Sequence, residues 1–418
     1  MSGAVDGSFF SSRWVARPDW VQEAHDGRLP KGFRAAGVAC GVKPGGERDL
    51  GLVVCDAVAT TSAARFTRSG TQSAPVLLNR QDSRLWQLRA VVVNSGNANA
   101  ATGGRGLDDA AAMRAAASVV AGVDASQVAV ASTGVIGVPL PIERITAGIA
   151  RLGGELRADG ADDFAQAIRT TDAFPKQVTL DVRLQAGTVR LSVQAKGAGM
   201  ISPSFATLLV FVQTDAAIEA DELDLLLTVC ARRSFERISV DGQLSTSDTI
   251  VIQASGESGV RIEPKTHDER LFGEALDAAL RQVALLVVRD GEGARRVGRV
   301  VVKGGDQHLA TRVAHAIADS PLVKTALYGA DPNWGRILQA VGAALPGTAP
   351  LHVDISIEDV VVCVDGGNVA YDERALAQAV TREEVQYEIV LPGEGAEVER
   401  YFSDLGHGYV TINAEYTT

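Results

Sequence analysis

Residues 196–211 are Lys196-Gly-Ala-Gly-Met-Ile-Ser-Pro-Ser-Phe-Ala206-Thr207-Leu-Leu-Val-Phe211, a glycine-rich loop that runs directly into an apolar strand. Such a junction can hold the Ala206–Thr207 peptide bond strained and exposed, with the Thr207 hydroxyl close to the preceding carbonyl. An N→O acyl shift and hydrolysis would then free the α-amino group of Thr207. Because an α-amine has a pKa of about 7.7, it could act as a base for its own hydroxyl. The alternative is an ordinary hairpin loop before a strand that begins with threonine.

On both sides of this stretch, short apolar runs bounded by turn residues predict β-strands. The clearest is a hairpin, 177–184 and 188–195, whose second strand leads into Lys196. Other strands are expected at 50–55, 89–94, 128–131, 208–213, 299–303, 352–355, 360–364 and 388–391. Helices are expected at 108–122, 141–153, 221–235, 269–288 and 308–318, and residues 331–336 are expected to form a turn before a further helix. The mixture predicts an α/β (α+β) fold of layers with mostly antiparallel strands.

The composition is that of a globular protein, with 46% hydrophobic and 22% charged residues in a chain of 418. This length favours two or three packed subdomains. The net charge of −11 argues against nucleic acids and anionic membranes as partners. No segment approaches the roughly 20 apolar residues of a membrane span, and residues 1–22 lack the apolar core of a secretory signal. We therefore expect a cytoplasmic protein.

The cysteines and histidines give no sign of a disulfide framework or a metal site. The six histidines never occur at the spacing of metal ligands. The cysteines are far apart in the sequence, which predicts buried free thiols of a reducing compartment. They are Cys40, Cys55, Cys230 and Cys363. We expect no metal ion.

A set of short motifs occurs in a fixed order along the chain. It includes Val92-Val-Asn-Ser-Gly-Asn-Ala-Asn99, Ser132-Thr-Gly-Val-Ile-Gly137 and Asp290-Gly-Glu-Gly-Ala294. The other motifs lie at 30–38, 170–172, 196–200, 206–207, 239–242, 320–325, 331–336 and 413–418. Together they resemble the ornithine acetyltransferase family, also called the glutamate N-acetyltransferase or ArgJ-type family. The resemblance covers nearly the whole chain, from about Pro30 to the last residue.

The resemblance implies a fold and its processing. We expect a layered αββα sandwich of the self-processing ornithine acetyltransferase kind, with a smaller C-terminal subdomain. Cleavage would give an α chain, residues 1–206, which carries the oxyanion hole and the processing loop. The β chain, residues 207–418, would begin with the nucleophile and end with a substrate-binding tail. A dimer of these heterodimers is the expected assembly.

The resemblance also assigns catalytic roles to individual residues. Thr207 matches the nucleophile, and Ala206–Thr207 matches the bond that is cleaved. Thr133 and Gly134 match the pair whose hydroxyl and N–H form the oxyanion hole. A turn after a buried strand also favours a Thr-Gly pair, and the two roles are compatible.

The expected substrate-binding residues are Thr170, Lys196, Thr207, Glu292, Asn413 and Thr418. Lys196 suits a substrate carboxylate and Glu292 suits an ammonium group. The alternative for both is a solvated surface charge, which is the usual place of a single lysine or glutamate. Thr171 is adjacent to Thr170 and stays an alternative to it.

The implied reaction is ping-pong transfer of an acetyl group in arginine biosynthesis. The Thr207 hydroxyl attacks N2-acetylornithine, ornithine leaves, and glutamate takes the acetyl group from the acetyl-Thr207 ester. These small molecules are the expected partners and no cofactor is expected. Acetyl-CoA stays open as a second acetyl donor.

Two segments depart from the family pattern. Ser202-Pro-Ser-Phe205 stands where members usually have His-Pro-Asn-Met, and Gln243-Leu244 stands where they have Asp-Thr. The catalytic residues are retained, whereas the walls near the substrate differ. A divergent paralogue that acts on another N-acylated amino acid is therefore one alternative. A self-processing amidohydrolase or aminopeptidase and a non-catalytic amino-acid-binding protein are two others.

Overall fold

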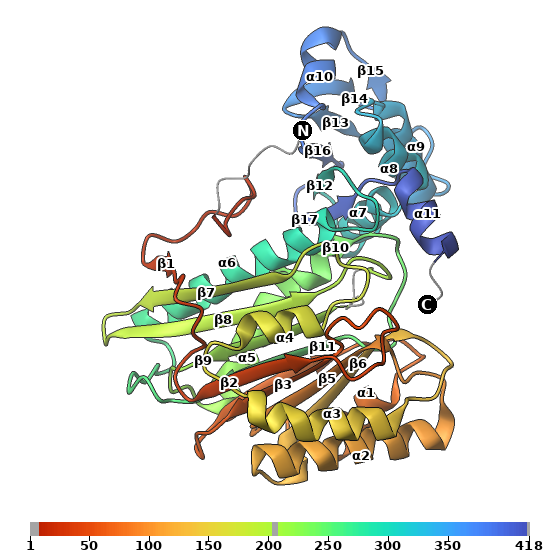
Figure 1. The fold of residues 1–418 in the computed structure, drawn as a ribbon. Coiled ribbons are helices and arrows are strands. Elements are labelled where there is room, and N and C mark those ends of the chain that lie inside the picture. Colours follow the sequence, from red (N-terminus) through yellow and green to blue (C-terminus); the bar gives the residue numbers. More distant parts are fainter. Residues whose placement is uncertain (1–7, 203–207, 416–418) are drawn as a thin grey trace.

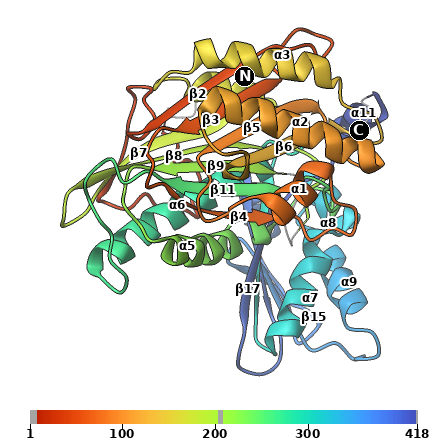
Figure 2. The ribbon, with the colours of Figure 1, turned by 90° about the horizontal axis from the view of Figure 1, so that it is seen from below.

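The computed structural model describes residues 8–202 and 208–415. Two β-sheets pack face to face, each covered by helices on its outer side, and a third sheet with its own helices forms a C-terminal subdomain (Figure 1). Seen from below, the layers follow one another as α2 and α3, two sheets, and α5 and α6 (Figure 2). The predicted αββα sandwich with a smaller C-terminal subdomain is confirmed.

The first inner sheet has the strand order β2-β3-β5-β6. Its strands are β2 (Phe33–Val38), β3 (Leu50–Cys55), β5 (Ala90–Asn97) and β6 (Val128–Val135). All six positions of β3 are buried, because one face meets the second sheet and the other meets helices. The covering helices are α1 (Ala74–Asp82), α2 (Gly103–Ala121) and α3 (Ile142–Glu155).

The start of α2 differs from the prediction, because the helix begins at Gly103 and not near Asp108. Its first turn contains Gly106, which is buried against the Thr102 side chain. A Cβ atom at Gly106 would lie 1.9 Å from the Thr102 Oγ1 atom. Gly106 is therefore a helical residue whose lack of a side chain permits close packing, whereas nothing lies within 4 Å of the Cβ positions of Gly103 and Gly104.

The second inner sheet has the strand order β1-β7-β8-β9-β11-β4. Its strands are β1 (Val21–Glu23), β4 (Thr61–Phe66), β7 (Lys176–Arg183), β8 (Thr188–Lys196), β9 (Leu209–Thr214) and β11 (Thr249–Ala254). The predicted hairpin is the antiparallel pair β7 and β8. Strand β9 lies antiparallel to β8 and parallel to β11. Helices α5 (Ala220–Arg233) and α6 (His267–Arg289) cover the outer face.

Small side chains allow a helix to insert between the two sheets. Helix α4 (Ala161–Ala167) packs on β2 and β3, and its Phe164 ring meets the Phe211 ring edge to face at 5.3 Å. A Cβ atom at Gly51 would lie only 2.7 Å from the Phe164 ring. The abundance of glycine and alanine thus replaces aromatic bulk in this core.

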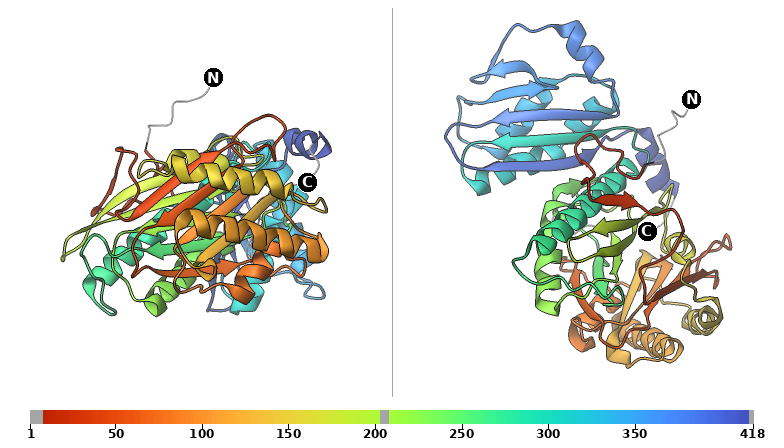
Figure 3. Two further views of the ribbon diagram at one scale, coloured as in Figure 1. Left: turned by 60° about the horizontal axis from the view of Figure 1, so that its bottom comes forward. Right: turned by 90° about the vertical axis from the view of Figure 1, so that its left-hand side faces the viewer.

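The C-terminal subdomain contains a sheet of strand order β10-β17-β12-β16-β13-β14-β15 and stands at one end of the sandwich (Figure 3). Its strands are β10 (Ile238–Ser239), β12 (Val297–Lys303), β13 (Asp354–Ile357), β14 (Val360–Val364), β15 (Gly367–Asn368), β16 (Glu384–Val390) and β17 (Glu397–Ser403). Its helices are α7 (Gln307–Ala318), α8 (Pro321–Tyr328), α9 (Trp334–Ala344) and α10 (Glu373–Ala379).

Strands β12, β13 and β16 have different bounds in the structure from those predicted, and β12 begins two residues early, at Val297. Strand β16 begins at Glu384, four residues before the predicted start, because its polar residues alternate with the buried Val385 and Tyr387. Strand β13 is shifted towards Ile357. The predicted turn at 331–336 precedes α9, and the Asn333 side chain accepts a hydrogen bond from the Arg336 N–H at the helix start.

The cysteines are free thiols in the structure, and three of them are buried. Cys40 is an exception to the prediction, since it is only half-buried beside Asp49. Among the described residues, no group of three or more His, Cys, Asp and Glu residues could hold a metal ion. None of the helices within 8–202 and 208–415 is long and apolar enough to cross a membrane.

Candidate active site

A cavity of about 160 Å³ lies where both inner sheets and the C-terminal helix α11 (His407–Glu415) meet. Every predicted site residue that the structure describes lines it. These residues are Thr133, Gly134, Thr170, Lys196, Glu292 and Asn413. Ala206, Thr207 and Thr418 lie outside the described residues. Segments far apart in the sequence therefore form one cavity.

Strand pairing places the predicted oxyanion pair at the cavity. Strands β5 and β6 are parallel, so their C-terminal ends meet, with Thr133 beside Ser95 and Gly134 beside Gly96. Both predicted residues belong to β6 itself, which continues past the predicted end at residue 131. A Cβ atom at Gly134 would lie 2.3 Å from the Gly96 carbonyl carbon, and its φ angle is +131°. Only glycine fits here.

Lys196 is a buried side chain and not a solvated surface residue. It ends β8, opposite Leu209 of β9, and is only 2% exposed. Its Nζ atom donates a hydrogen bond to the Thr133 Oγ1 atom at 3.3 Å. Burial lowers the pKa of Lys196, and the carboxylate of Asp172 partly offsets this effect. Within the described parts of the chain Lys196 forms no ion pair, so its ammonium group can bind an anionic substrate.

A buried ion-pair network supports the floor of the cavity. The Lys176 ammonium group lies 2.8 Å from Asp172 and 2.5 Å from Asp290. Asp172 also accepts hydrogen bonds from the N–H groups of Thr170 and Gly197. Burial alone would raise the pKa of Asp172, but the ammonium groups of Lys176 and Lys196 hold it well below its usual range. Asp172 therefore ties together two segments that line the cavity.

Glu292 is oriented by hydrogen bonds from two sides. Its Oε1 atom accepts a hydrogen bond from the Thr171 hydroxyl at 2.8 Å, and its Oε2 atom accepts one from the Asn413 amide at 2.7 Å. The side chain is 9% exposed, so it too is not a solvated surface charge. Thr170 and Thr171 both line the cavity, and Thr171 is the one whose hydroxyl contacts Glu292.

Sequence reasoning did not identify Asp241 as a cavity residue. Its carboxylate accepts hydrogen bonds from the N–H groups of Met200 and Ile201 and from the Tyr409 hydroxyl. These bonds fix the loop after Lys196 and the helix α11. Gln243, one of the departures from the family pattern, also lines the cavity. Asp241 lies in a quoted motif, but nothing in the motif indicates which segments it contacts.

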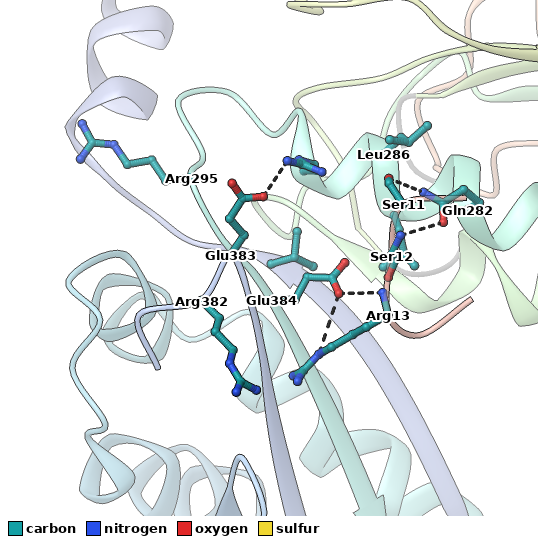
Figure 4. Close-up of a pocket in the computed structure, with 12 residues that line it drawn as sticks. Ser11, Ser12, Arg13, Gln282, Leu286, Arg295, Arg382, Glu383 and Glu384 are labelled. Atoms are coloured by element: carbon teal, nitrogen blue, oxygen red, sulfur yellow. Dashed lines mark hydrogen bonds and ion pairs between the residues drawn. The ribbon is translucent and has the colours of Figure 1, made fainter. Parts of the chain in front are cut away.

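A separate cavity of about 240 Å³ lies between the N-terminal segment, α6 and β16 (Figure 4). Four of its charged side chains form two ion pairs, Arg289 with Glu383 and Arg13 with Glu384. The Gln282 side chain hydrogen bonds to the N-terminal segment. This cavity contains no predicted site residue and marks the junction between the sandwich and the C-terminal subdomain.

The amino-acid sequence matches known proteins over nearly the whole chain. The family model described as "ArgJ family" matches residues 34–418. The arginine biosynthesis bifunctional protein ArgJ of Symbiobacterium thermophilum is 41% identical, and the match covers 93% of this chain and 98% of that protein. The corresponding protein of Geobacter sulfurreducens is 42% identical, and the match covers 93% of this chain and 99% of that protein.

Solved structures give further matches. A crystal structure of ornithine acetyltransferase complexed with ornithine, from Mycobacterium tuberculosis, is 38% identical. The match covers 45% of this chain and 99% of that chain, with a TM-score of 0.41. The ArgJ structure from Bacillus halodurans is 39% identical, with 45% and 97% covered and a TM-score of 0.41. Since the curated relatives match over nearly their whole length, the chain belongs to the ArgJ family of arginine-biosynthesis enzymes.

Proposed function

We propose that this chain transfers an acetyl group from N2-acetylornithine to glutamate through an acetyl ester on Thr207. The supporting observation is that the described site residues form one cavity with a buried cation, Lys196, and a buried carboxylate, Glu292. A relative has been solved with ornithine bound. Both proposed substrates are amino acids, which carry the carboxylate and nitrogen groups that such a cavity suits.

The two buried charges have separate tasks in substrate binding. The Lys196 ammonium group binds the substrate carboxylate, and Glu292 binds an ammonium group of the substrate. Because Thr171 and Asn413 already orient Glu292, little side-chain freedom is lost when the substrate enters. Thr170, Thr418 and the remaining polar groups supply directional hydrogen bonds.

Thr133 and Gly134 stabilise the oxyanion of each tetrahedral intermediate. The Thr133 oxygen accepts a hydrogen bond from Lys196, so its own hydroxyl proton is free to point at the oxyanion. The Gly134 N–H supplies the second hydrogen bond. Loss of one such donor typically raises the barrier by about 2.7–4 kcal/mol.

Self-cleavage prepares the nucleophile. Scission of the Ala206–Thr207 bond gives the chains 1–206 and 207–418 and frees the Thr207 α-amine. This amine takes the hydroxyl proton when Thr207 attacks the acetyl donor, and it later helps glutamate to attack the ester. A hydrolase would use water in place of glutamate, and a binding protein would stay intact.

The variant Thr207→Ala tests this proposal. We expect it to remain a single chain and to lose acetyl transfer, whereas the natural chain should separate into two chains under denaturing conditions. Mass spectrometry of the natural protein mixed with N2-acetylornithine should show one acetyl group on the 207–418 chain. Transfer of that acetyl group to glutamate excludes an enzyme that only hydrolyses its substrate. A Thr207→Ala protein with full acetyl-transfer activity would disprove the proposal. Incubation with acetyl-CoA and glutamate tests the second donor.

A further inference from the structure

Self-cleavage needs a proton acceptor that the mature enzyme does not need. In the uncut chain the nitrogen of Thr207 is part of an amide, whose lone pair is delocalised and is not basic. The Thr207 α-amine is therefore available for acetyl transfer but not for the cut that produces it. If the proposed function holds, another group must accept the hydroxyl proton during cleavage.

Asp248 is the buried carboxyl group next to this point of the chain. It precedes β11 and is 0% exposed. Its Oδ1 atom accepts a hydrogen bond from the Leu208 N–H at 3.1 Å, and the Leu208 carbonyl accepts one from the Thr249 N–H at 3.1 Å. The Leu208 nitrogen is covalently bonded to the carbonyl carbon of Thr207. Asp248 is thus anchored one peptide unit from the proposed nucleophile.

The second carboxyl oxygen of Asp248, Oδ2, is not the one that accepts the hydrogen bond from the Leu208 N–H. This Oδ2 atom is buried and has no hydrogen-bond partner among residues 8–202 and 208–415. Buried polar atoms without a partner are rare and costly, and those that persist call for a functional explanation. The preceding residues Ser245, Thr246 and Ser247 line the cavity, so Asp248 directly follows a segment of the cavity wall.

The surroundings of Asp248 favour proton exchange near neutral pH. Burial raises the pKa of Asp248 to about 7. The Leu208 N–H, the hydroxyls of Ser245 and Thr67, and the charge of Lys196 at the end of β8 each oppose this rise. Thr67 directly follows β4. The groups that act on the pKa of Asp248 therefore come from β8, from the ends of β4 and β9, and from the loop before β11.

We propose that Asp248 is the proton acceptor for self-cleavage of the Ala206–Thr207 bond. The Asp248 carboxylate takes the Thr207 hydroxyl proton as the Thr207 oxygen attacks the Ala206 carbonyl carbon. The carbon–nitrogen bond then breaks, and the nitrogen receives that proton from Asp248, which gives an ester and a free amine. Water hydrolyses the ester, leaving a carboxylate on Ala206 and a hydroxyl on Thr207. The Asp248 carboxylate is regenerated.

The variant Asp248→Asn tests this role in the full-length chain. Asparagine keeps an oxygen for the Leu208 N–H but cannot accept the proton. Each chain is made by cell-free synthesis, and its cleavage is followed by gel electrophoresis and mass spectrometry. We expect cleavage to slow on the order of 100-fold, with the uncut variant still melting cooperatively.

Asp215→Asn is the matched control. Asp215 is also a buried carboxyl group whose pKa burial raises, and it follows the opposite end of β9. Its oxygens accept hydrogen bonds from the N–H groups of Arg190 and Lys31. We expect Asp215→Asn to be cleaved at the rate of the natural chain.

The pH dependence distinguishes proton transfer from a purely structural role. A carboxylate base is active when ionised, so cleavage of the natural chain should accelerate as the pH rises through about 7 and then level off. Asp248→Asn should lose this step. The inference is overturned if Asp248→Asn is cleaved as fast as the natural chain. It is also overturned if the cleavage rate of the natural chain does not change with pH between about 6 and 8. A natural chain that is never cleaved refutes the proposed function instead.

Discussion

At the scale of single residues, Lys176 shows how the cavity depends on a group that does not line it. Its side chain is completely buried between Asp172 and Asp290. Asp172 in turn holds the N–H groups of Thr170 and Gly197. Loss of the Lys176 ammonium group would leave two buried carboxylates without the cation that pairs with both, which typically costs about 3–5 kcal/mol.

The variant Lys176→Met should therefore be strongly destabilised at pH 7, with a free energy of unfolding lower by about 3–5 kcal/mol. Because Lys176 helps to hold the pKa of Asp172 below its usual range, this contribution is present at neutral pH and is lost as acid protonates Asp172. The deficit should thus shrink as the pH falls below about 4. Urea unfolding at several pH values measures the difference in free energy of unfolding between the variant and the natural chain.

Lys303→Met is the control for this experiment. Lys303 pairs with Glu388 at 2.7 Å, but both side chains are partly exposed. Such a pair contributes at most about 1 kcal/mol. Equal destabilisation of the two variants would contradict the importance given to the buried network.

The residues that sequence reasoning missed share a physical cause. A lysine at the start of a strand, such as Lys176, is usually exposed, and its partner Asp290 is far away in the sequence. Asp248 likewise can be recognised as a buried carboxyl group only from the structure, where it accepts a hydrogen bond from the Leu208 N–H. In contrast, Lys196 and Glu292 could be selected because they stand in quoted motifs next to glycines. Burial and long-range pairing cannot be obtained from local pattern.

At the scale of elements, α11 is the helix that completes the cavity. None of its residues is buried, and few contacts hold it. Gly408 lies against Gly293, where a Cβ atom on Gly408 would come within 2.9 Å of the Gly293 Cα atom. Tyr409 bonds to Asp241, and Asn413 bonds to Glu292. The position of α11 therefore matters more for the cavity than for the hydrophobic core.

The variant Gly408→Val should push α11 away from Gly293 and misplace Asn413. We expect KM to rise about tenfold, because small displacements of positioning groups are expensive. The melting temperature should change little, since α11 buries little surface. Gly154→Ala on α3 is the control, because nothing lies within 4 Å of its Cβ position. A large loss of stability in Gly408→Val with normal KM would contradict this account.

Elements with strong patterns were predicted well, and elements defined by their packing were not. The hairpin β7–β8 alternates apolar and polar residues, and its position is confirmed almost to the residue. Helix α4 was not predicted, because it is short and is stabilised by Phe164 between the sheets. The early start of α2 was missed because the helix begins with Gly103 and Gly104, and glycine is a poor helix former.

At the scale of the whole molecule, the proposed cut divides a sheet whose strands are interleaved. Strands β1, β4, β7 and β8 would belong to the chain 1–206, whereas β9 and β11 would belong to 207–418. Strands β9 and β11 lie between β8 and β4. Strand β9 pairs with β8, and β11 pairs with β4. Each piece therefore lacks the hydrogen-bond partners that the other supplies.

We expect the two pieces to stay together after cleavage and to separate only when the sheet unfolds. Size-exclusion chromatography in native buffer should give one peak that contains both chains. In concentrated guanidinium chloride the chains should elute apart, and their loss of association should coincide with the loss of β-structure by circular dichroism. Separation of folded chains in native buffer would contradict the interleaved arrangement.

The double anchoring by Asp172 also has an evolutionary consequence. Since one carboxylate holds both the Thr170 segment and the Gly197 segment, a mutation that displaces one of them disturbs the other, and this side of the cavity tolerates little drift. The exposed Gln243 side chain, in contrast, holds no second segment among the described residues, since its amide donates a hydrogen bond to the Asp241 carbonyl within the same turn. If the chain transfers acyl groups as proposed, substitutions at Gln243 are therefore the ones most able to admit a different acyl donor, and Gln243 is also a position where this sequence departs from the family pattern.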